Sequence, residues 1–333
     1  MLEAVRRIAR RGGWARWVRS GADERAVLGG CRFDRAQGER VCTFFEQFLN
    51  QTMGEWAGQP FHLLDWQRQD VLMPLFGWRR EDGGRRYRKG DVFVAKKNGK
   101  STLAAGLVLY FLLADGEPRA EVYGAAYTRQ QAGIVYQEAA AMARSANHGL
   151  NVRFDCRDSH KRILCPSTGS FYQALAGEAG GVEGINAHAV ILDEIHVQKT
   201  DVLWKALTYA KSARRQPMTL SISTVGTADR SKIWWSRYEY AKGILSGTLT
   251  DHSAFAYIAQ ADEACAQNMD LAGDVAQWRK ANPSLGVTVK EDQFREDYQE
   301  ARNSPVMFNA FLRYRLNVPT SQDSRLLNMD DWD

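Results

Sequence analysis

The chain has 333 residues, of which 44% are hydrophobic and 25% charged, a composition ordinary for a globular protein with one large domain and a smaller one. No apolar run approaches the roughly 20 residues that span a bilayer, and the arginine-rich start has no apolar stretch behind it, which argues against a secretory signal. The five scattered cysteines indicate free thiols in a reducing cytoplasm, and the net charge of +5 permits a nucleic-acid partner without requiring one.

Basic residues gather in two segments. One lies at the start of the chain (Arg6, Arg7, Arg10, Arg11, Arg16, Arg19), and the other surrounds a Gly-Gly pair (Arg79, Arg80, Arg85, Arg86, Arg88, Lys89). Each segment is either a solvated face or a surface that contacts a phosphate backbone, and the sequence leaves both interpretations open.

From residue 91 onward, short β-branched runs alternate with longer amphipathic runs. The pattern predicts strands at 91–95, 121–126, 189–193 and 218–224, helices at 100–114, 128–145 and 201–214, and a hairpin formed by 151–156 and 162–165. Strands that alternate with helices predict an α/β fold, with a mainly parallel sheet and helices on both faces.

The pattern changes beyond residue 226. Helices are predicted at 231–245, 275–281, 291–302 and 305–313, with one strand at 253–260. We therefore divide the chain into a helical and basic segment at 1–60, an α/β core at 61–228, a small and mostly helical subdomain at 229–318, and a polar linker at 319–333.

The first predicted strand runs into a loop that has the chemistry of a phosphate site. Its candidate nucleotide contacts are Lys96, Lys97, Asn98, Gly99, Lys100, Ser101 and Thr102. A strand-to-helix junction leaves backbone N–H groups free to bind phosphate oxygens. Gly99 lets the backbone come close, Lys100 reaches the β and γ phosphates, and the Ser101 hydroxyl coordinates Mg²⁺. Val94 stands where the general pattern G-x-x-x-x-G-K-[ST] has its first glycine, and the alternative interpretation is a basic surface turn.

Two carboxylates follow the apolar strand Ala189-Val-Ile-Leu-Asp193. In a nucleotide hydrolase, Asp193 would hold Mg²⁺ through water, and Glu194 would orient and deprotonate the attacking water. Such a pair is also a common end for a buried strand. Its position about 90 residues after the phosphate loop, in a sheet of the right type, favours catalysis.

With both motifs in place, residues 60–230 resemble the ATPase region of the large terminase subunit of tailed double-stranded DNA bacteriophages. The loop Ala95-Lys-Lys-Asn-Gly-Lys-Ser101 is similar to that family's phosphate loop, in which a basic residue near the start replaces the first glycine. The run from Ala189 to His196 is similar to its acidic motif, and Ala126-Tyr-Thr-Arg-Gln-Gln-Ala132 is similar to the segment after its second strand.

Two further segments carry the resemblance. Leu63-Leu-Asp-Trp-Gln-Arg68 is similar to the family's adenine-reading motif, with Gln67 as the base reader. Ser223-Thr-Val-Gly-Thr227 is similar to its coupling motif, so the resemblance implies that Ser223 and Thr224 contact the nucleotide and sense the γ phosphate.

The resemblance implies a phosphate-loop NTPase of the additional-strand type, in which the subdomain at 229–318 is a lid. It implies that ATP and Mg²⁺ are used to move double-stranded DNA into a procapsid. The implied partners are other copies of the chain in a ring, a portal and a small terminase subunit, in the host cell cytoplasm and without a membrane.

Ring motors take an arginine finger from a neighbouring subunit, and no arginine here matches a motif. The candidates are Arg153, Arg157, Arg162, Arg214 and Arg215. We prefer Arg214 as the catalytic residue because it ends the predicted helix just before the coupling strand.

Large terminase subunits also carry a nuclease domain after the ATPase. We expect this chain to stop about where that domain would begin, at Asp333, and therefore to hydrolyse ATP without cutting DNA. Two other functions stay open. A DNA helicase or repair ATPase needs a second sheet domain, for which 231–333 is too short and too helical. A silent DNA-binding assembly module would not need the intact Lys100 and Glu194.

Overall fold

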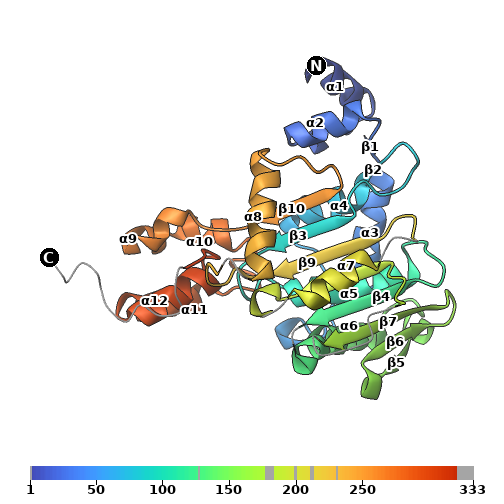
Figure 1. The fold of residues 1–333 in the computed structure, drawn as a ribbon. Helices are drawn as coiled ribbons and strands as arrows, with labels where there is room; N and C mark the ends of the chain where they lie inside the picture. Colours follow the sequence, from blue (N-terminus) through green and yellow to red (C-terminus); the bar gives the residue numbers. More distant parts are fainter. Residues whose placement is uncertain are drawn as a thin grey trace.

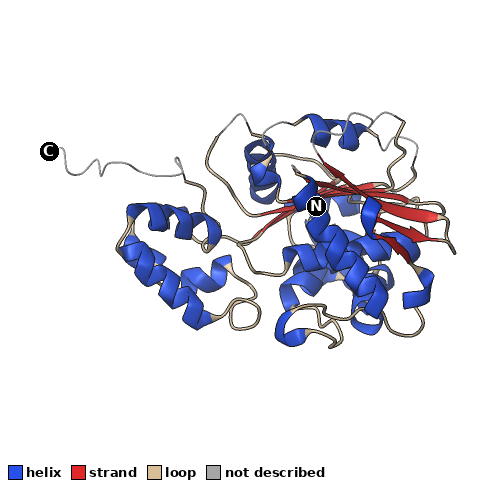
Figure 2. Ribbon diagram, turned by 90° about the horizontal axis from the view of Figure 1, so that it is seen from below, coloured by secondary structure: helices blue, strands red, loops and turns tan. Residues whose placement is uncertain are grey.

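The computed structural model describes residues 2–126, 128–176, 184–198, 201–210, 214–229 and 232–320. Its centre is an eight-stranded sheet in the order β10-β3-β9-β8-β4-β7-β6-β5, with helices on both faces (Figures 1 and 2). The strands are β3 (Lys89–Phe93), β4 (Glu121–Ala126), β5 (Asp155–Arg157), β6 (Arg162–Cys165), β7 (Ser170–Ala176), β8 (Ala189–Asp193), β9 (Met218–Ser223) and β10 (Ala254–Ile258). The strands from β10 to β7 run parallel, and β6 and β5 continue the sheet antiparallel.

Both faces of the sheet are buried. On β8, Ala189 and Ile191 belong to the apolar core on one face, while Val190 and Leu192 belong to the core on the other. Consecutive strand residues point to opposite faces, so a strand buried on both sides is apolar throughout. The continuous apolar run that predicted this strand has this physical cause.

Most helices cover the first face. They are α3 (Arg35–Phe48), the π-helix η3 (Trp66–Leu72), α4 (Met73–Gly77), α5 (Lys100–Leu113) and α6 (Arg129–Ser145), and near them lie α1 (Leu2–Arg11), α2 (Gly21–Leu28) and the small sheet of β1 (Arg32–Phe33) and β2 (Trp78–Arg79). The opposite face carries α7 (Val202–Tyr209) and α8 (Ile233–Ser246), which bury Leu207 and Trp234 against it. The predicted fold class, a mainly parallel sheet between helices, is therefore confirmed (Figure 2).

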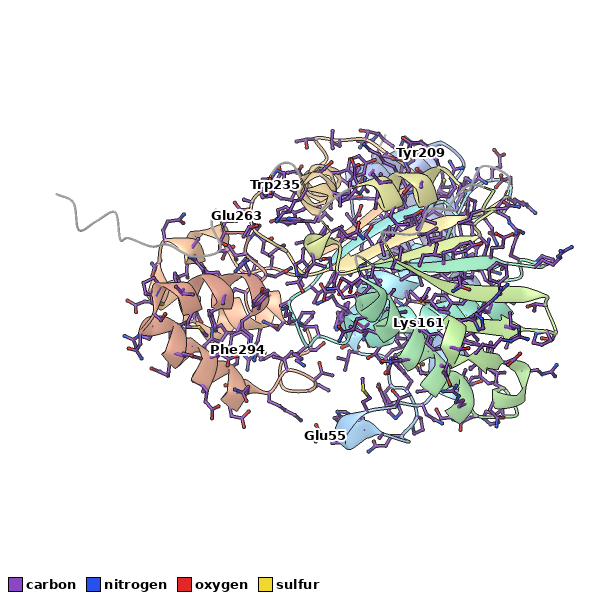
Figure 3. The ribbon with its side chains drawn as sticks, turned by 60° about the horizontal axis from the view of Figure 1, so that its bottom comes forward. Glu55, Lys161, Tyr209, Trp235, Glu263 and Phe294 are labelled. Carbon is purple, nitrogen blue, oxygen red and sulfur yellow. The ribbon has the colours of Figure 1, made fainter. Side chains whose placement is uncertain are left out.

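The remaining helices form a separate group beside the carboxyl ends of the central strands (Figure 1). They are α9 (Met269–Ala272), α10 (Val275–Ala281), α11 (Glu291–Arg302) and α12 (Pro305–Tyr314). Trp278, Phe294 and Phe311 form their common core, and Figure 3 labels Phe294 within the group. Among the described residues, no helix has both the length and the apolar character needed to cross a bilayer.

Two strands of the main sheet differ from the sequence-based expectation. β10, which we grouped with the helical subdomain, pairs with β3 at the edge of the main sheet, so the helical group begins after it. β7 was not predicted, because its burial alternates only in part. The predicted helix at 201–214 ends at Tyr209, and residues 211–213 lie outside the described part of the chain.

Candidate nucleotide site

The phosphate loop connects β3 to α5 at the carboxyl ends of the parallel strands. Gly99 is the residue before the first turn of α5 and has φ 82°, a left-handed conformation that favours glycine. A side chain at this position would also meet Nε2 of Gln67 at 3.4 Å. Because the first N–H groups of a helix have no partner within it, the start of α5 offers donors to an anion.

Lys100 connects the loop to two neighbouring strands. Its buried Nζ donates to Val94 O at 3.0 Å, to Ala95 O at 3.0 Å and to Thr224 Oγ1 at 2.8 Å, and lies 3.6 Å from Glu194 Oε1. Thr224 directly follows β9, and Glu194 directly follows β8. One ammonium group thus joins the loop, the acidic pair and the segment predicted to sense the γ phosphate.

Ser101 and Asp193 form the second link between the loop and β8. Ser101 Oγ donates to Asp193 Oδ2 at 2.9 Å, and the buried Oδ1 of Asp193 has no hydrogen-bond partner among the described residues. Burial and the neighbouring Glu194 raise the pKa of Asp193 above its ordinary value. An unpartnered carboxylate oxygen beside a hydroxyl is a donor set that suits Mg²⁺, so the residues present fit this ion.

Glu194 lies where the chain leaves β8, in a left-handed conformation with φ 51°. Its Oε2 accepts from Thr224 N at 3.2 Å and lies 3.0 Å from His196 Nδ1. Burial alone would raise the pKa of Glu194, but Lys100 and His196 outweigh burial and lower it. The carboxylate is therefore ionised at neutral pH, as a group that accepts a proton must be.

Ser223 and Thr224, at the end of β9, lie next to Glu194 and His196. Ser223 Oγ donates to Thr224 O at 2.7 Å and lies 3.2 Å from His196 Nδ1. His196 thus contacts both the acidic residue and the end of β9.

A cavity of about 210 Å³ adjoins the phosphate loop. Its lining includes Gly99 and Thr102 from the loop and α5, the apolar side chains of Phe61 and Trp56, and Gln67. Oε1 of Gln67 accepts from Leu64 N at 3.0 Å. An apolar slot that adjoins a phosphate loop and includes the Gln67 amide is suited to a nucleobase.

The other loop residues take different positions. Lys97 is exposed, with φ 70°, while Asn98 is fully buried. Lys96 is turned toward the helical group, because its Nζ lies 3.5 Å from the centre of the Tyr314 ring and its N–H donates to Tyr314 O at 3.0 Å. The basic residue near the start of the loop is therefore held by α12, an arrangement that the sequence did not predict.

Arg214 is not at this site. Its guanidinium donates to Glu117 Oε1 at 3.0 Å, Arg119 O at 3.0 Å and Asn186 O at 3.1 Å, around the residues that precede β4 and β8. These lie at the amino ends of the strands, whereas the phosphate loop lies at the carboxyl ends. Because all three of its nitrogens are used within its own chain, we do not retain Arg214 as the catalytic finger.

The two basic segments differ in burial and in ion pairing. Arg85 and Arg86 are buried in ion pairs with Asp115 and Asp23, so the second segment is largely structural. In contrast, the four α1 arginines (Arg6, Arg7, Arg10, Arg11) are exposed, and none forms an ion pair with the residues that the structure describes.

Sequence reasoning missed a group of polar residues from the helical group that reach the phosphate loop. They are Asn282, Ser284 and Thr288. They lie more than 180 residues from the loop in the chain, as the 184-residue separation of Asn98 and Asn282 illustrates, and they match no motif, so no signal in a single sequence could have found them.

A phosphate loop at a strand-to-helix junction, facing two carboxylates at the end of a neighbouring parallel strand, defines a P-loop NTPase. A family model described as "Terminase large subunit, ATPase domain" matches residues 65–243, more than half of the chain. The chain belongs to the terminase large subunit family.

Individual relatives agree with this assignment. The large terminase subunit of Enterobacteria phage HK97 is 26% identical over 302 residues, which are 89% of this chain and 56% of that protein. Protein YmfN of Escherichia coli (strain K12) is 29% identical over 150 residues, which are 45% of this chain and 32% of YmfN. The crystal structure of the HK97 large terminase superposes with a TM-score of 0.72 at 25% identity, covering 85% of this chain and 55% of that one. The chain thus spans about half the length of the HK97 protein.

A second family model corrects one expectation. The model described as "Terminase large subunit, endonuclease domain" matches residues 248–333, so the expectation that the chain lacks this domain was wrong. The match begins just before β10, a strand that pairs with the ATPase sheet, and it includes the helices after that strand. We made the error because we had assigned those helices to a lid. Among the described residues, no group of three or more His, Cys, Asp or Glu side chains is placed to hold a metal ion. Asp330, Asp331 and Asp333 lie outside the described part of the chain.

Proposed function

We propose that this chain is the ATP-hydrolysing motor of a phage or prophage terminase, which drives double-stranded viral DNA into a procapsid. One observation carries the proposal. Lys100 and Ser101, at the mouth of α5, meet Glu194 and Asp193 at the end of β8, with 2.9 Å between Ser101 Oγ and Asp193 Oδ2. Family membership supplies the biological setting.

In the proposed reaction the side chains have separate roles. Lys100 and the loop N–H groups from Lys97 to Thr102 bind the phosphates, and Gln67 reads the edge of adenine. Glu194 accepts a proton as water attacks the γ phosphorus and the bond to the ADP oxygen breaks. Ser223 and Thr224 sense the γ phosphate through their contacts with Glu194 and Lys100.

Ser101 and Asp193 are the proposed holders of Mg²⁺. When bound, the ion would neutralise charge on the β and γ phosphates. The buried Oδ1 of Asp193, which has no other partner among the described residues, supports this role.

The proposed partners are duplex DNA, further copies of the chain in a ring, a portal and a small terminase subunit, all in the host cytoplasm. The exposed α1 arginines support contact with a polyanion. The helicase alternative finds no second sheet domain among the described residues after β10, which form the helical group. The silent-module alternative conflicts with the assembled contacts among Lys100, Thr224 and Glu194.

Phosphate release from ATP tests the proposal. Lys100→Ala removes the charge that binds the phosphates and Glu194→Ala removes the base, so each should lower turnover at least about 100-fold. The assay includes duplex DNA and a protein concentration that favours assembly, since a residue from a neighbouring copy completes the site in ring motors. Turnover that is unchanged in either folded variant refutes the ATPase assignment.

A further inference from the structure

The segment 282–290, between α10 and α11, contacts one side of the phosphate loop, which we call its outer side. Asn98, Asn282 and Ser284 are all at most 1% exposed, although Asn98 and Asn282 lie 184 residues apart. Buried polar groups need partners, so the contacts among these side chains are an essential part of the local structure.

Asn98 is the centre of these contacts. Its Nδ2 donates to Asn282 Oδ1 at 2.9 Å and to Ala95 O at 3.2 Å, while its Oδ1 accepts from Ser284 N at 3.1 Å. Asn282 is fixed in turn, because its Nδ2 donates to Arg315 O at 2.7 Å and to Trp278 O at 3.1 Å.

The backbone carbonyls of the loop are held from the same side. Ser284 Oγ donates to Asn98 O at 3.3 Å and accepts from Trp66 Nε1 at 2.9 Å. Thr288 Oγ1 donates to Lys97 O at 2.8 Å. Two consecutive carbonyl groups therefore point toward the segment 282–288.

This geometry fixes where the loop N–H groups point. In a trans peptide, the carbonyl of one residue and the N–H of the next point in opposite directions. Because Lys97 O and Asn98 O point toward the segment 282–288, the N–H groups of Asn98 and Gly99 point away from it. Among the described residues, neither of these N–H groups makes a hydrogen bond.

We propose that Asn282 and Ser284, with Thr288, are positioning residues that orient the phosphate loop for nucleotide binding from the outer side. The inference rests on the proposed function of the loop. Val94 stands in place of the first glycine of the general pattern, so the loop has lost one source of backbone freedom and takes its conformation from contacts with a distant segment. Asn282 and Ser284 contact the loop from the segment 282–288, and Thr288 also lines the cavity beside Gly99 and Gln67.

The test compares ATP binding in Ser284→Ala, Thr288→Val and wild type. Ser284→Ala removes the hydroxyl that holds Asn98 O, and Thr288→Val keeps the side-chain shape at an exposed position, so folding is retained in at least one variant. We expect the Kd for ATP to rise about 10-fold in Ser284→Ala, which loses the hydrogen bonds to Asn98 O and from Trp66 Nε1. It should rise about 3-fold in Thr288→Val, which loses only the bond to Lys97 O. Ser284→Thr should restore wild-type binding because it keeps the hydroxyl.

Two controls separate positioning from lost stability and from the base cavity. Ser304→Ala removes the cap of α12, where Ser304 accepts from Met307 N at 3.4 Å, and should lower Tm without changing the Kd. Tripolyphosphate, which has no base, should inhibit Ser284→Ala less than wild type, because the change acts on the phosphate loop. If Ser284→Ala binds ATP and tripolyphosphate as Ser304→Ala does, the inference is wrong. If wild type itself binds neither, the proposed function fails instead.

Discussion

Ser101 Oγ donates a hydrogen bond of 2.9 Å to Asp193 Oδ2 and so joins the first turn of α5 to the end of β8. The two residues are 92 positions apart in the chain and meet because β3 and β8 lie on either side of β9 with their carboxyl ends together. Ligands of α/β proteins bind at this edge of a parallel sheet. The pair therefore marks the side of the site where we propose that the metal binds.

Changing either member of this pair should lower turnover that depends on Mg²⁺. Asp193→Asn keeps the acceptor for Ser101 but removes the charge, and Ser101→Ala removes a hydroxyl ligand. We expect a loss of roughly 100-fold or more for Asp193→Asn and a smaller one for Ser101→Ala. Phosphate release across a Mg²⁺ titration measures both. Wild-type Mg²⁺ dependence in Asp193→Asn would show that the ion is held elsewhere.

His196 should assist Glu194 without replacing it. Its Nδ1 lies 3.0 Å from Glu194 Oε2 and 3.2 Å from Ser223 Oγ, so it fixes the orientation of the carboxylate. We expect His196→Ala to lower kcat by about 10-fold, less than Glu194→Gln, with the Kd for ATP unchanged. Single-turnover hydrolysis and equilibrium binding separate the two effects. A loss in His196→Ala as large as that in Glu194→Gln would identify His196 as the base.

Gln67 should decide which base is accepted. Gln67→Glu keeps the acceptor for Leu64 N and replaces the amide donor with a carboxylate. A site that hydrogen-bonds a polar edge rejects substrates that do not match it, so we expect the preference for ATP over GTP to fall about 10-fold or more. Competition binding with both nucleotides measures this preference. The exposed Gln59, whose Nε2 donates to Glu55 O, provides a matched control, since Gln59→Ala should leave the preference intact.

The sequence predicted those parts of the site that depend on local order. Strand, loop and helix follow directly in residues 89–113, so the order of residues alone placed Gly99, Lys100 and Ser101 at the mouth of a helix. The link from this loop to Asp193 and Glu194 could be expected as well, because parallel strands place their carboxyl ends at one edge. The overall α/β class followed from the same alternation.

Contacts between distant segments could not be predicted. The cation–π contact between Lys96 and Tyr314 depends on how α12 lies against the sheet, and no local sequence pattern encodes that arrangement. The surroundings of Arg214 could not be predicted for a related reason. Its position before β9 in the chain suggested the active site, but the residue lies at the amino ends of the strands, where Glu117 binds it.

A buried ion pair at the far end of the sheet should control stability and leave nucleotide binding unchanged. Arg85 and His188 both contact Asp115, and all three side chains are at most 2% exposed. Asp115→Asn leaves the Arg85 charge without its partner, so we expect a loss of about 3–5 kcal/mol in the free energy of unfolding. Lys205→Ala, which removes an exposed ion pair with Asp201, should change it by less than about 0.5 kcal/mol.

This stabilisation should depend on pH in a defined direction. Burial alone would raise the pKa of Asp115, but Arg85 and His188 outweigh burial and lower it. A carboxyl with a lowered folded-state pKa stabilises the protein fully above its unfolded pKa of about 4 and loses that contribution as the pH falls. The difference between wild type and Asp115→Asn should therefore be constant near neutral pH and shrink in acid. Urea unfolding at about pH 7, 5 and 3 measures it, since the loss falls below the unfolded pKa. A difference that grows in acid would contradict the assigned pKa direction.

The exposed face of α1 should contribute to DNA affinity. Val5 and Ala9 are buried on one side of this helix. The four arginines on it are exposed (Arg6, Arg7, Arg10, Arg11). Each phosphate contact adds about 0.9 to the slope of log K against log salt concentration, so replacing all four arginines with glutamine should lower that slope by up to about 3.6. Duplex DNA binding across a salt series measures the slope, and ATP affinity should not change, because α1 lies far from the phosphate loop (Figure 1). An unchanged slope would place the DNA-binding surface on another face of the molecule.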